Sequence, residues 1–256
     1  MTAVTTIKAP GTNLTYLHRY RDGRAFVVDP GDAVAVLQAL QQHHLSLTTI
    51  LATHHHWDHV AGAEDLQRKT HCDLIGGVRT LVPSPDRVVA DGDVLTIGEV
   101  TIHVLATPGH TQDSVCYYIP AQGSTPGVVY TGDTLFVGGC GRLLEGDAPT
   151  MWQSLQRVAA LPADTLVYCS HDYTLENYEF AATIAPNHRR FQERLAEVQK
   201  AVEYSRLTVP STIAQERTTN IFLLADHPQI KAALNMPGAR PDEVFAELRS
   251  RKDLSG

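Results

Sequence analysis

The sequence contains few of the features that define several common classes of protein. It has only four cysteines in 256 residues, and no two are spaced as Cys-x-x-Cys, which argues against a zinc ribbon or a thioredoxin-type redox site. No hydrophobic run approaches the length of a membrane span, and the first residues lack the basic-then-apolar pattern of a secretory signal. We therefore expect a cytoplasmic protein without a membrane partner, in which four reduced thiols serve as packing residues: Cys72, Cys116, Cys140 and Cys169.

Basic residues are also scarce. The chain has 21 Lys and Arg against 28 Asp and Glu, a formal net charge of -7, and its charges are spread along the sequence. Proteins whose main partner is DNA or RNA normally present a basic face, so we expect no nucleic-acid partner. Because 43% of the residues are hydrophobic, the chain can form a substantial core, either as one large domain or as a main domain with a smaller companion.

Histidine is abundant instead, with 13 copies, and the most informative segment runs from His54 to His59 as His-His-His-Trp-Asp-His. Imidazole and carboxylate groups are ligands that suit zinc, iron or manganese. His54 and His56 are two residues apart, so their side chains point the same way on an extended backbone. Asp58 and the adjacent His59 diverge and can reach a second ion. The segment therefore predicts ligands for two neighbouring metal ions, which is typical of hydrolases.

Three further ligand candidates, His110, Asp133 and His171, each stand at the end of a predicted strand. Glycine or another small residue beside each would let the backbone approach an ion. Asp133 has two oxygens and can bridge two ions. The predicted first metal is bound by His54, His56 and His110, and the second by Asp58, His59 and His171, with Asp133 between them.

Other residues of these types have simpler explanations. His55 lies on the opposite side of the local backbone and is interpreted as a non-ligand, and Trp57 as a packing wall. An aspartate in a Gly-Asp turn is usually only a turn residue, so Asp133 alone would not indicate a metal. Five histidines without companion ligands are interpreted as surface or core residues: His18, His71, His103, His188 and His227.

The hydrophobic pattern changes near residue 172. Before it, short apolar runs predict strands within 1–30, at 49–52, within 88–119, at 128–130 and at 165–169. Helical periodicity predicts helices at 32–44, 58–69, 150–160, 175–185, 189–206, 227–235 and 241–251. A β-rich α/β region, residues 1–172, is therefore expected to precede a helical region, residues 173–256.

The order and spacing of these blocks resemble the metallo-β-lactamase superfamily. The pattern is His54-x-His56-x-Asp58-His59 followed by His110, Asp133 and His171. The segments 136–146 and 168–174 further resemble the hydroxyacylglutathione hydrolases, the glyoxalase II family, as does the Arg-x-x-Lys pattern of Arg249 and Lys252. The similarity extends from about residue 13 to the C-terminus.

This resemblance implies an α/β fold, an αββα sandwich of two mixed sheets with helices outside, followed by a helical C-terminal domain that binds substrate. It implies two divalent metal ions, most simply zinc, with iron or manganese as alternatives. The implied reaction is hydrolysis of S-D-lactoylglutathione to glutathione and D-lactate, the second step of methylglyoxal detoxification, with no obligate protein partner. The implied catalytic residues are His54, His56, Asp58 and Asp133, and the implied glutathione-binding residues are Arg142, Tyr173, Arg249 and Lys252.

The mechanism expected from these groups is attack on the thioester carbonyl by a hydroxide that bridges the two ions, since metal coordination lowers the pKa of water from about 15.7 toward 7. Asp58 would be a ligand and could also orient the hydroxide. Two departures from the family pattern stand out. Leu144 replaces a common aromatic residue, which weakens the expected peptide contacts, and Ile221 replaces the proline of an Asn-Pro-Phe-Leu-Arg segment.

Alternative functions remain open at this level. A persulfide dioxygenase of the same superfamily would use one iron and oxygen, and typically lacks the long helical tail. A β-lactamase would be expected to carry an export signal, a superfamily nuclease a basic arm, and a flavodiiron reductase a Glu in place of His56. A metal-containing binding module without activity would usually have damaged ligands, whereas all seven candidates are present here.

Overall fold

The computed structural model describes residues 3–9, 11–77 and 85–255. Its contacts divide the chain into two compact units, Met1–Ala106 with Asp113–Gly132, and Thr107–Gln112 with Asp133–Gly256. The boundary predicted after residue 172 stays a prediction, since neither limit of these units coincides with it. Residues 1, 2 and 10 of the predicted N-terminal strands lie outside the described residues.

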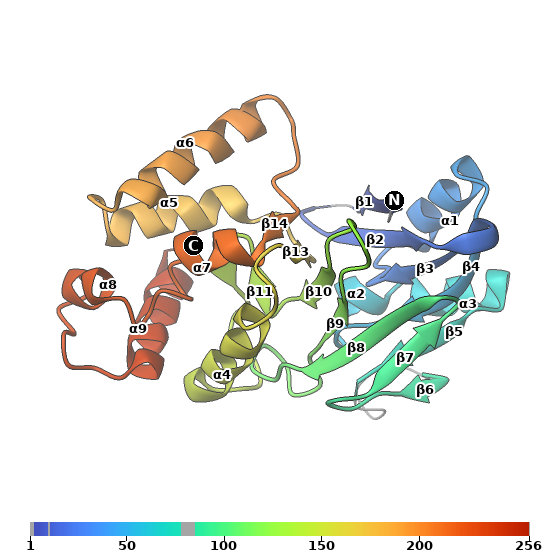
Figure 1. Cartoon of the computed structure of the whole chain (residues 1–256), viewed down its shortest axis with the longest axis horizontal. Helices are drawn as coiled ribbons and strands as arrows, with labels where there is room; N and C mark the ends of the chain where they lie inside the picture. The colour runs from blue at the N-terminus through green and yellow to red at the C-terminus, as the bar shows by residue number, and fades with distance from the viewer. Residues whose placement is uncertain (1–2, 10, 78–84, 256) are drawn as a thin grey trace. The chain divides into compact units, whose positions relative to one another are not determined.

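Within its described residues, the first unit contains a mixed sheet in the order β1-β2-β3-β4-β5-β6 and the antiparallel strands β7 to β10 (Figure 1). Strands β1 to β3 are antiparallel, and β3 to β6 are parallel. The strands are β1 (Ala3–Lys8), β2 (Leu14–Arg19), β3 (Arg24–Val28), β4 (Ser46–Leu51), β5 (Asp73–Gly76), β6 (Arg87–Val88), β7 (Val94–Ile97), β8 (Val100–Ala106), β9 (Val115–Ile119) and β10 (Val128–Gly132). The helices are η1 (Arg21–Gly23), α1 (Ala33–Gln42), α2 (Trp57–Val60) and α3 (Ala63–Thr70).

Successive side chains of β2 and β3 alternate between the two faces of the first sheet. Both faces are buried. Leu17 and Val27 point to the face that packs against α1 and α3. Tyr16 and Phe26 point to the other face, where their rings lie 5.6 and 6.4 Å from the ring of Tyr130 on β10. Helices, a first sheet and a second set of strands thus form successive layers, as the α/β sandwich prediction requires.

The parallel pairing of β3 and β4 brings two loops to one edge of the sheet. Val28 pairs with Leu51, and the N–H of Asp29 donates to the carbonyl of Leu51 at 3.0 Å. The segment that begins at Thr53 therefore emerges beside Asp29. Sites in layered α/β folds are commonly built at this edge, where strands end and loops begin.

The helix predicted over 58–69 is interrupted. Two helices, α2 and α3, replace it, and the break falls at Ala61 and Gly62. The N–H of Gly62 donates to the carbonyl of Pro30 at 2.8 Å, and a Cβ at Gly62 would lie only 2.6 Å from that oxygen. The close approach to the Pro30 loop requires glycine and ends the first helix.

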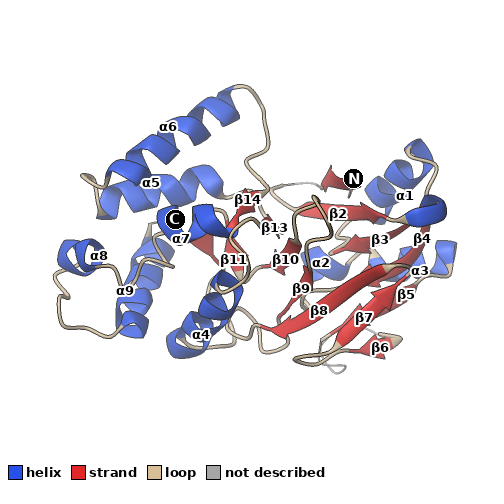
Figure 2. Ribbon diagram, in the orientation of Figure 1, coloured by secondary structure: helices blue, strands red, loops and turns tan. Residues whose placement is uncertain are grey.

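The second unit contains the antiparallel pair β13 and β14, the hairpin of β11 and β12, and helices α4 to α9 (Figure 2). The strands are β11 (Leu135–Phe136), β12 (Gly139–Cys140), β13 (Leu166–Cys169) and β14 (Ser211–Thr212). The helices are α4 (Ala148–Ala159), α5 (Thr174–Ile184), α6 (Arg189–Glu203), α7 (Ile213–Thr219), α8 (Pro228–Ala233) and α9 (Pro241–Leu254).

Aromatic rings form the centre of the helical part of this unit. Phe222 stacks on Phe180 at 6.0 Å and meets Phe245 edge-on at 5.9 Å, and Trp152 lies 6.2 Å from Phe245. The predicted helices at 150–160, 175–185, 189–206, 227–235 and 241–251 correspond to α4, α5, α6, α8 and α9. Helix α7 was not predicted, because its seven residues are too few for a clear apolar period.

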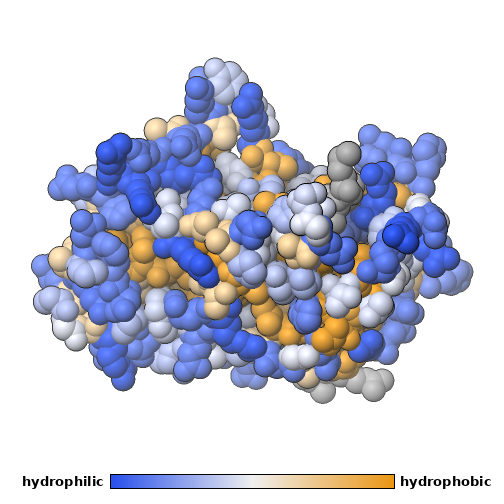
Figure 3. Space-filling model, viewed as in Figure 1, coloured by the Kyte–Doolittle hydropathy of each residue, from blue (hydrophilic) through white to orange (hydrophobic). Residues whose placement is uncertain are grey.

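Hydrophilic side chains cover much of the face in Figure 3, with apolar surface gathered over the region of β7 and β8. Val94 on β7 is among the exposed apolar residues, with 49% of its surface accessible. None of the helices in the described ranges is both long and apolar enough to cross a lipid bilayer.

Candidate metal centre

In the first unit, the segment after β4 presents four predicted ligands side by side. Nε2 of His54 lies 3.1 Å from Nδ1 of His56. Nε2 of His59 lies 3.6 Å from a carboxylate oxygen of Asp58. Ligands bonded at about 2.0–2.1 Å around a tetrahedral ion are separated by about 3.3 Å. These separations therefore suit atoms that share an ion.

Hydrogen bonds to the other ring nitrogens fix which nitrogen each histidine can offer. Nδ1 of His59 lies 3.0 Å from the Asp29 carboxylate, and Nδ1 of His54 lies 3.1 Å from the Thr53 hydroxyl. That hydroxyl donates to Asp29 at 2.7 Å, so its oxygen accepts from His54. Both rings consequently carry their proton on Nδ1 and present an Nε2 lone pair, the usual arrangement of a metal-binding histidine and its supporting partner.

Asp58 is also held by a partner that the sequence did not reveal. The side-chain amide of Asn13 donates to the carbonyl of Asp58 at 2.9 Å and to its carboxylate at 3.1 Å. Asn13 follows β1, 45 residues away along the chain. The bond from the Asn13 amide to the carboxylate restricts the orientation of the Asp58 side chain, as a metal ligand requires.

In the second unit, Asp133 points one carboxylate oxygen toward each of two histidines. Its Oδ2 lies 3.4 Å from Nε2 of His110, and its Oδ1 lies 3.4 Å from Nε2 of His171. Both distances exceed those of good hydrogen bonds and match the spacing of ligands on one ion. A carboxylate with each oxygen beside a different imidazole is suited to bridging two ions.

The loop after β12 orients His110. Nδ1 of His110 donates to the carbonyl of Arg142 at 2.8 Å, which leaves Nε2 to face Asp133. Gly141 makes this approach possible, since a Cβ there would lie 2.0 Å from the Asp133 carbonyl and 3.0 Å from the His110 ring. A larger residue at this position would displace a ligand.

The donor types of the predicted ligands fit a divalent metal. All seven predicted ligands belong to groups of His and carboxylate side chains whose ligand atoms could hold an ion. Imidazole and carboxylate donors suit zinc, iron and manganese alike. The donor set therefore indicates a divalent ion but does not identify the element.

Two residues of the histidine segment have other environments. Nδ1 of His55 lies 2.8 Å from the Asp113 carboxylate. Trp57, interpreted from the sequence as a packing wall, is instead 78% exposed, and that interpretation is wrong. Asp29, Asn13 and Asp113 all contact this segment from distant positions, and the sequence analysis identified none of the three.

Three of the four predicted substrate-binding residues are exposed or partly exposed. Tyr173 is partly exposed and stacks on the ring of His171 at 4.9 Å. Arg142 is exposed, and Lys252 is partly exposed. The Lys252 ammonium donates to the carbonyl of Glu176 at 3.1 Å. Burial, and to a smaller extent the charge of the nearby Arg249, lower the pKa of Lys252.

Arg249 is different, because it is buried. Its guanidinium donates to the carbonyl of Cys140 at 3.0 Å and to the carboxylate of Asp253 at 2.8 and 3.0 Å. It also lies 5.1 Å over the ring of Phe222. These contacts join α9 to the hairpin that precedes Arg142, so Arg249 has a structural role in addition to any contact with substrate.

The four cysteines, all within the described residues, are buried and form no disulfide. Desolvation raises the pKa of Cys72 and of Cys169, and raises the pKa of Cys140 to about 11 although Arg249 opposes the rise. These three thiols are protonated at neutral pH, so none of them is an activated nucleophile.

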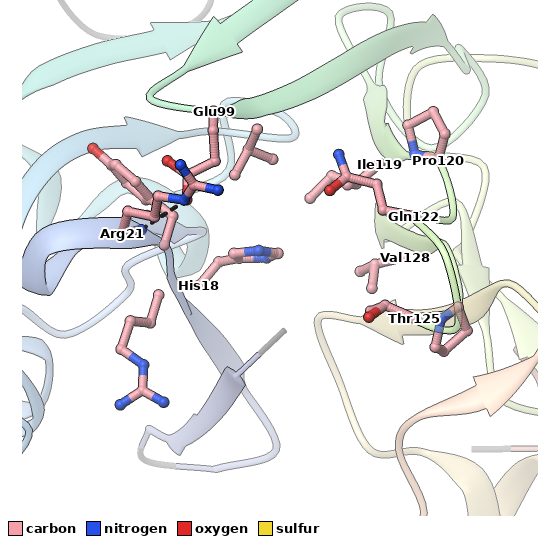
Figure 4. A pocket seen from close by; sticks show the side chains of 12 residues that line it. His18, Arg21, Glu99, Ile119, Pro120, Gln122, Thr125 and Val128 are labelled. Carbon is pink, nitrogen blue, oxygen red and sulfur yellow. Dashed lines mark hydrogen bonds and ion pairs between the residues drawn. The ribbon is translucent and has the colours of Figure 1, made fainter. Parts of the chain in front are cut away.

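A cavity of about 320 Å³ in the first unit is lined by none of the seven ligands (Figure 4). His18 lines it on one side, and Ile119, Pro120 and Val128 line the other. His18 stacks on Phe26 at 4.6 Å, and its Nδ1 lies 2.8 Å from the Tyr130 hydroxyl. Burial lowers the pKa of His18 to about 4.

This shift predicts a loss of stability in mild acid. The unfolded chain takes up a proton at His18 near pH 6.5, whereas the folded chain does so only near pH 4. The free energy of unfolding should therefore fall by up to about 3 kcal/mol as the pH drops through this window, and change no further from this cause below it. Urea unfolding of wild type and His18→Asn across the window measures the difference. Equal pH dependence in the two proteins would contradict the prediction.

Two family models together match nearly the whole chain. Residues 9–171 match the model of the metallo-β-lactamase superfamily, and residues 172–255 match the model of the hydroxyacylglutathione hydrolase C-terminus. The hydroxyacylglutathione hydrolase of Brucella anthropi is 46% identical over 229 residues, which cover 89% of this chain and 86% of that protein. The enzyme of Brucella ovis is 42% identical over 240 residues, covering 93% and 92%.

Solved structures agree on the fold. ETHE1 from Myxococcus xanthus aligns with a TM-score of 0.67 and 26% identity, over 99% of this chain and 100% of that one. TTHA1623, solved in a di-iron-bound form, aligns with a TM-score of 0.60 and 26% identity, over 85% and 98%. The fold is thus that of a metallo-β-lactamase, as predicted. The chain belongs to the metallo-β-lactamase superfamily and, within it, to the hydroxyacylglutathione hydrolase family.

Proposed function

We propose that this protein hydrolyses S-(2-hydroxyacyl)glutathione, with S-D-lactoylglutathione as the main substrate, to glutathione and the free 2-hydroxy acid. This is the second step of methylglyoxal detoxification. The observation that supports it most strongly is the Asp133 carboxylate, whose two oxygens each face the Nε2 of a different histidine. Relatives named hydroxyacylglutathione hydrolase, at 42–46% identity over most of the chain, support the choice of substrate.

We propose further that the ligands of the two units complete one dinuclear centre. His54, His56 and His110 would hold one ion, Asp58, His59 and His171 the other, and Asp133 would bridge them. The ligand spacing within each unit supports this assignment, as does the match of residues 9–171 to a metal-dependent superfamily. Zinc is the proposed metal, with iron and manganese as alternatives, and the di-iron form of TTHA1623 makes iron a serious one.

The reaction needs little beyond a strong nucleophile, because a thiolate with a pKa of about 8.5 leaves a thioester readily. Bound divalent ions would supply a water of lowered pKa and a positive charge for the carbonyl oxygen. The chain's own residues position these parts. Asp58, directed by Asn13, would orient the attacking water, and Asp29, through His59, and Thr53, through His54, would keep those imidazoles in the correct tautomer.

The glutathione moiety is anionic, so its binding requires local cations on an acidic protein. We propose that Arg142, Tyr173 and Lys252 bind it directly, within a C-terminal substrate-binding domain of residues 173–256 together with the loop at Arg142. Arg249 would bind the glycine carboxylate of glutathione only through those guanidinium N–H groups that do not already donate to Cys140 and Asp253. The cytoplasmic location and the independence from a protein partner stay predictions.

The decisive assay follows release of the glutathione thiol from S-lactoylglutathione, with elemental analysis of the same preparation. The matched comparison is a lactoyl thioester of a small thiol that lacks the tripeptide. We expect rapid hydrolysis of the glutathione ester and slow hydrolysis of the small one. Equal rates for both would disprove the glutathione assignment and leave the hydrolytic centre intact.

Lys252→Ala is expected to raise KM with little change in kcat. Its ammonium would bind the carboxylate equally in the ground state and the transition state, so its loss weakens both. An ordinary exposed charge pair is worth at most about 1 kcal/mol, which corresponds to a rise in KM of up to about fivefold. Initial rates over a range of substrate concentrations measure the split.

The neighbouring Arg251→Ala is the matched control. Arg251 is exposed and pairs with Glu247 on its own helix at 2.7 Å, so its removal should leave KM unchanged. An unchanged KM in Lys252→Ala would remove Lys252 from the substrate site.

A further inference from the structure

The hairpin of β11 and β12 lies between two predicted metal ligands of the second unit. It begins two residues after Asp133, and the chain that leaves it supplies the Arg142 carbonyl that accepts from His110. Its Gly141 packs against the backbone of Asp133 so closely that a Cβ would clash. The position of the hairpin therefore determines where Asp133 and His110 lie relative to each other.

Two buried side chains hold this hairpin: Glu216 in the first turn of α7, and Asn220 at its C-terminal end. One carboxylate oxygen of Glu216, Oε2, accepts from the N–H of Gly138 at 2.8 Å. The Asn220 amide donates to the carbonyls of Gly139 and Phe136 at 2.9 and 3.2 Å and to Glu216 Oε2 at 3.0 Å. Together they bind the turn of the hairpin and both of its strands.

Burying the carboxyl group of Glu216 costs free energy, which a purely structural position would avoid. Both it and Asn220 are 0% exposed, and the other Glu216 oxygen, Oε1, has no hydrogen-bond partner within the described part of the chain. Desolvation raises the pKa of Glu216, although the Gly138 N–H opposes the rise. One oxygen, Oε2, thus accepts from two N–H groups. An amide in its place could make the same two contacts.

We infer that Glu216, with Asn220, is a positioning residue for the metal centre: it holds the Gly138–Gly139 turn so that the Arg142 carbonyl keeps the His110 imidazole aimed at the ion shared with Asp133. The inference rests on the proposed metal centre. Glu216 touches neither ligand, and acts through the hairpin alone. Its effect should appear in metal affinity before it appears in any property of the substrate.

The test is zinc affinity of the full-length protein, measured by competition with a chromophoric chelator. Glu216→Ala should weaken zinc binding by about 10-fold, the lower end of the effect of losing a residue that bonds a ligand directly, because Glu216 acts through the hairpin. Glu216→Gln should restore wild-type affinity, since its carbonyl oxygen can accept from Gly138 and Asn220. Wild-type affinity in Glu216→Ala, or equal weakening in both variants, would overturn the inference.

General destabilisation is separated by Val198→Ala, a buried truncation on α6 that should lower stability and leave zinc affinity unchanged. Equal weakening of zinc binding by this control would also overturn the inference. If Glu216→Ala does not fold, Asn220→Ala carries the same expectation, because it removes the bonds to Gly139 and Phe136. Failure of the wild-type protein to bind zinc, iron and manganese would instead refute the proposed metal centre.

Discussion

Asp133→Asn is expected to abolish thioester hydrolysis through loss of metal. The substitution preserves shape but removes the negative charge and one acceptor oxygen, so one of the two imidazoles now faces an amide nitrogen. A bridging position tolerates neither change. We expect turnover to fall by at least about a thousandfold, roughly 4 kcal/mol of transition-state stabilisation, and the metal content to fall with it. Paired measurement of kcat/KM and metal per chain tests this, and His54→Ala should behave in the same way.

Asp147→Asn is the control for replacing an aspartate carboxylate by an amide at a position outside the proposed metal centre. Asp147 caps α4 by accepting from the N–H of Thr150 at 2.9 Å, and asparagine caps helices about as well as aspartate. That variant should keep full activity. An Asp133→Asn enzyme that retained both its metal and its turnover would show that this carboxylate is only a turn residue, the simpler explanation raised by its Gly-Asp context.

Arg249→Ala is expected to destabilise the protein by about 3 kcal/mol. The change leaves the buried carbonyl of Cys140 without its donor, removes the cation from the face of Phe222 and opens a cavity beside it. Because the same contact supports the hairpin before Arg142, kcat should fall as well. The family resemblance implied only a glutathione-binding role for Arg249, which would change chiefly KM. Urea unfolding and steady-state kinetics on one preparation separate the two effects.

Arg251→Ala again supplies the comparison, since an exposed arginine on the same helix should change stability by at most about 0.5 kcal/mol. An Arg249→Ala protein with wild-type stability and a raised KM would mean that Arg249 serves the substrate and not the fold.

The proposed metal ligands could be named from the sequence because the pattern that suggests them is local. His54, His56, Asp58 and His59 lie in one segment, and His110, Asp133 and His171 each follow a strand with a readable apolar pattern. The supporting groups could not be predicted, because strand pairing creates them. Asp29 reaches His59 only because β3 lies parallel to β4, and the Arg142 carbonyl reaches His110 only because Gly141 lets two backbones meet.

The fold followed the same rule. Long periodic segments such as α6 and α9 were predicted, whereas the break between α2 and α3 depends on a contact with Pro30 that no local pattern encodes. Arg249 shows the limit for single residues. A charged residue near the end of a chain is usually exposed, whereas packing against Phe222 and Cys140 buries Arg249.

Histidine and aspartate side chains are proposed to hold the metal that drives thioester hydrolysis. The most direct test is exhaustive chelation followed by stepwise return of zinc, with turnover of S-lactoylglutathione recorded against bound metal. We predict that activity disappears on chelation and returns as two ions bind per chain. A metal-depleted preparation that still hydrolyses the thioester at the full rate would contradict the account.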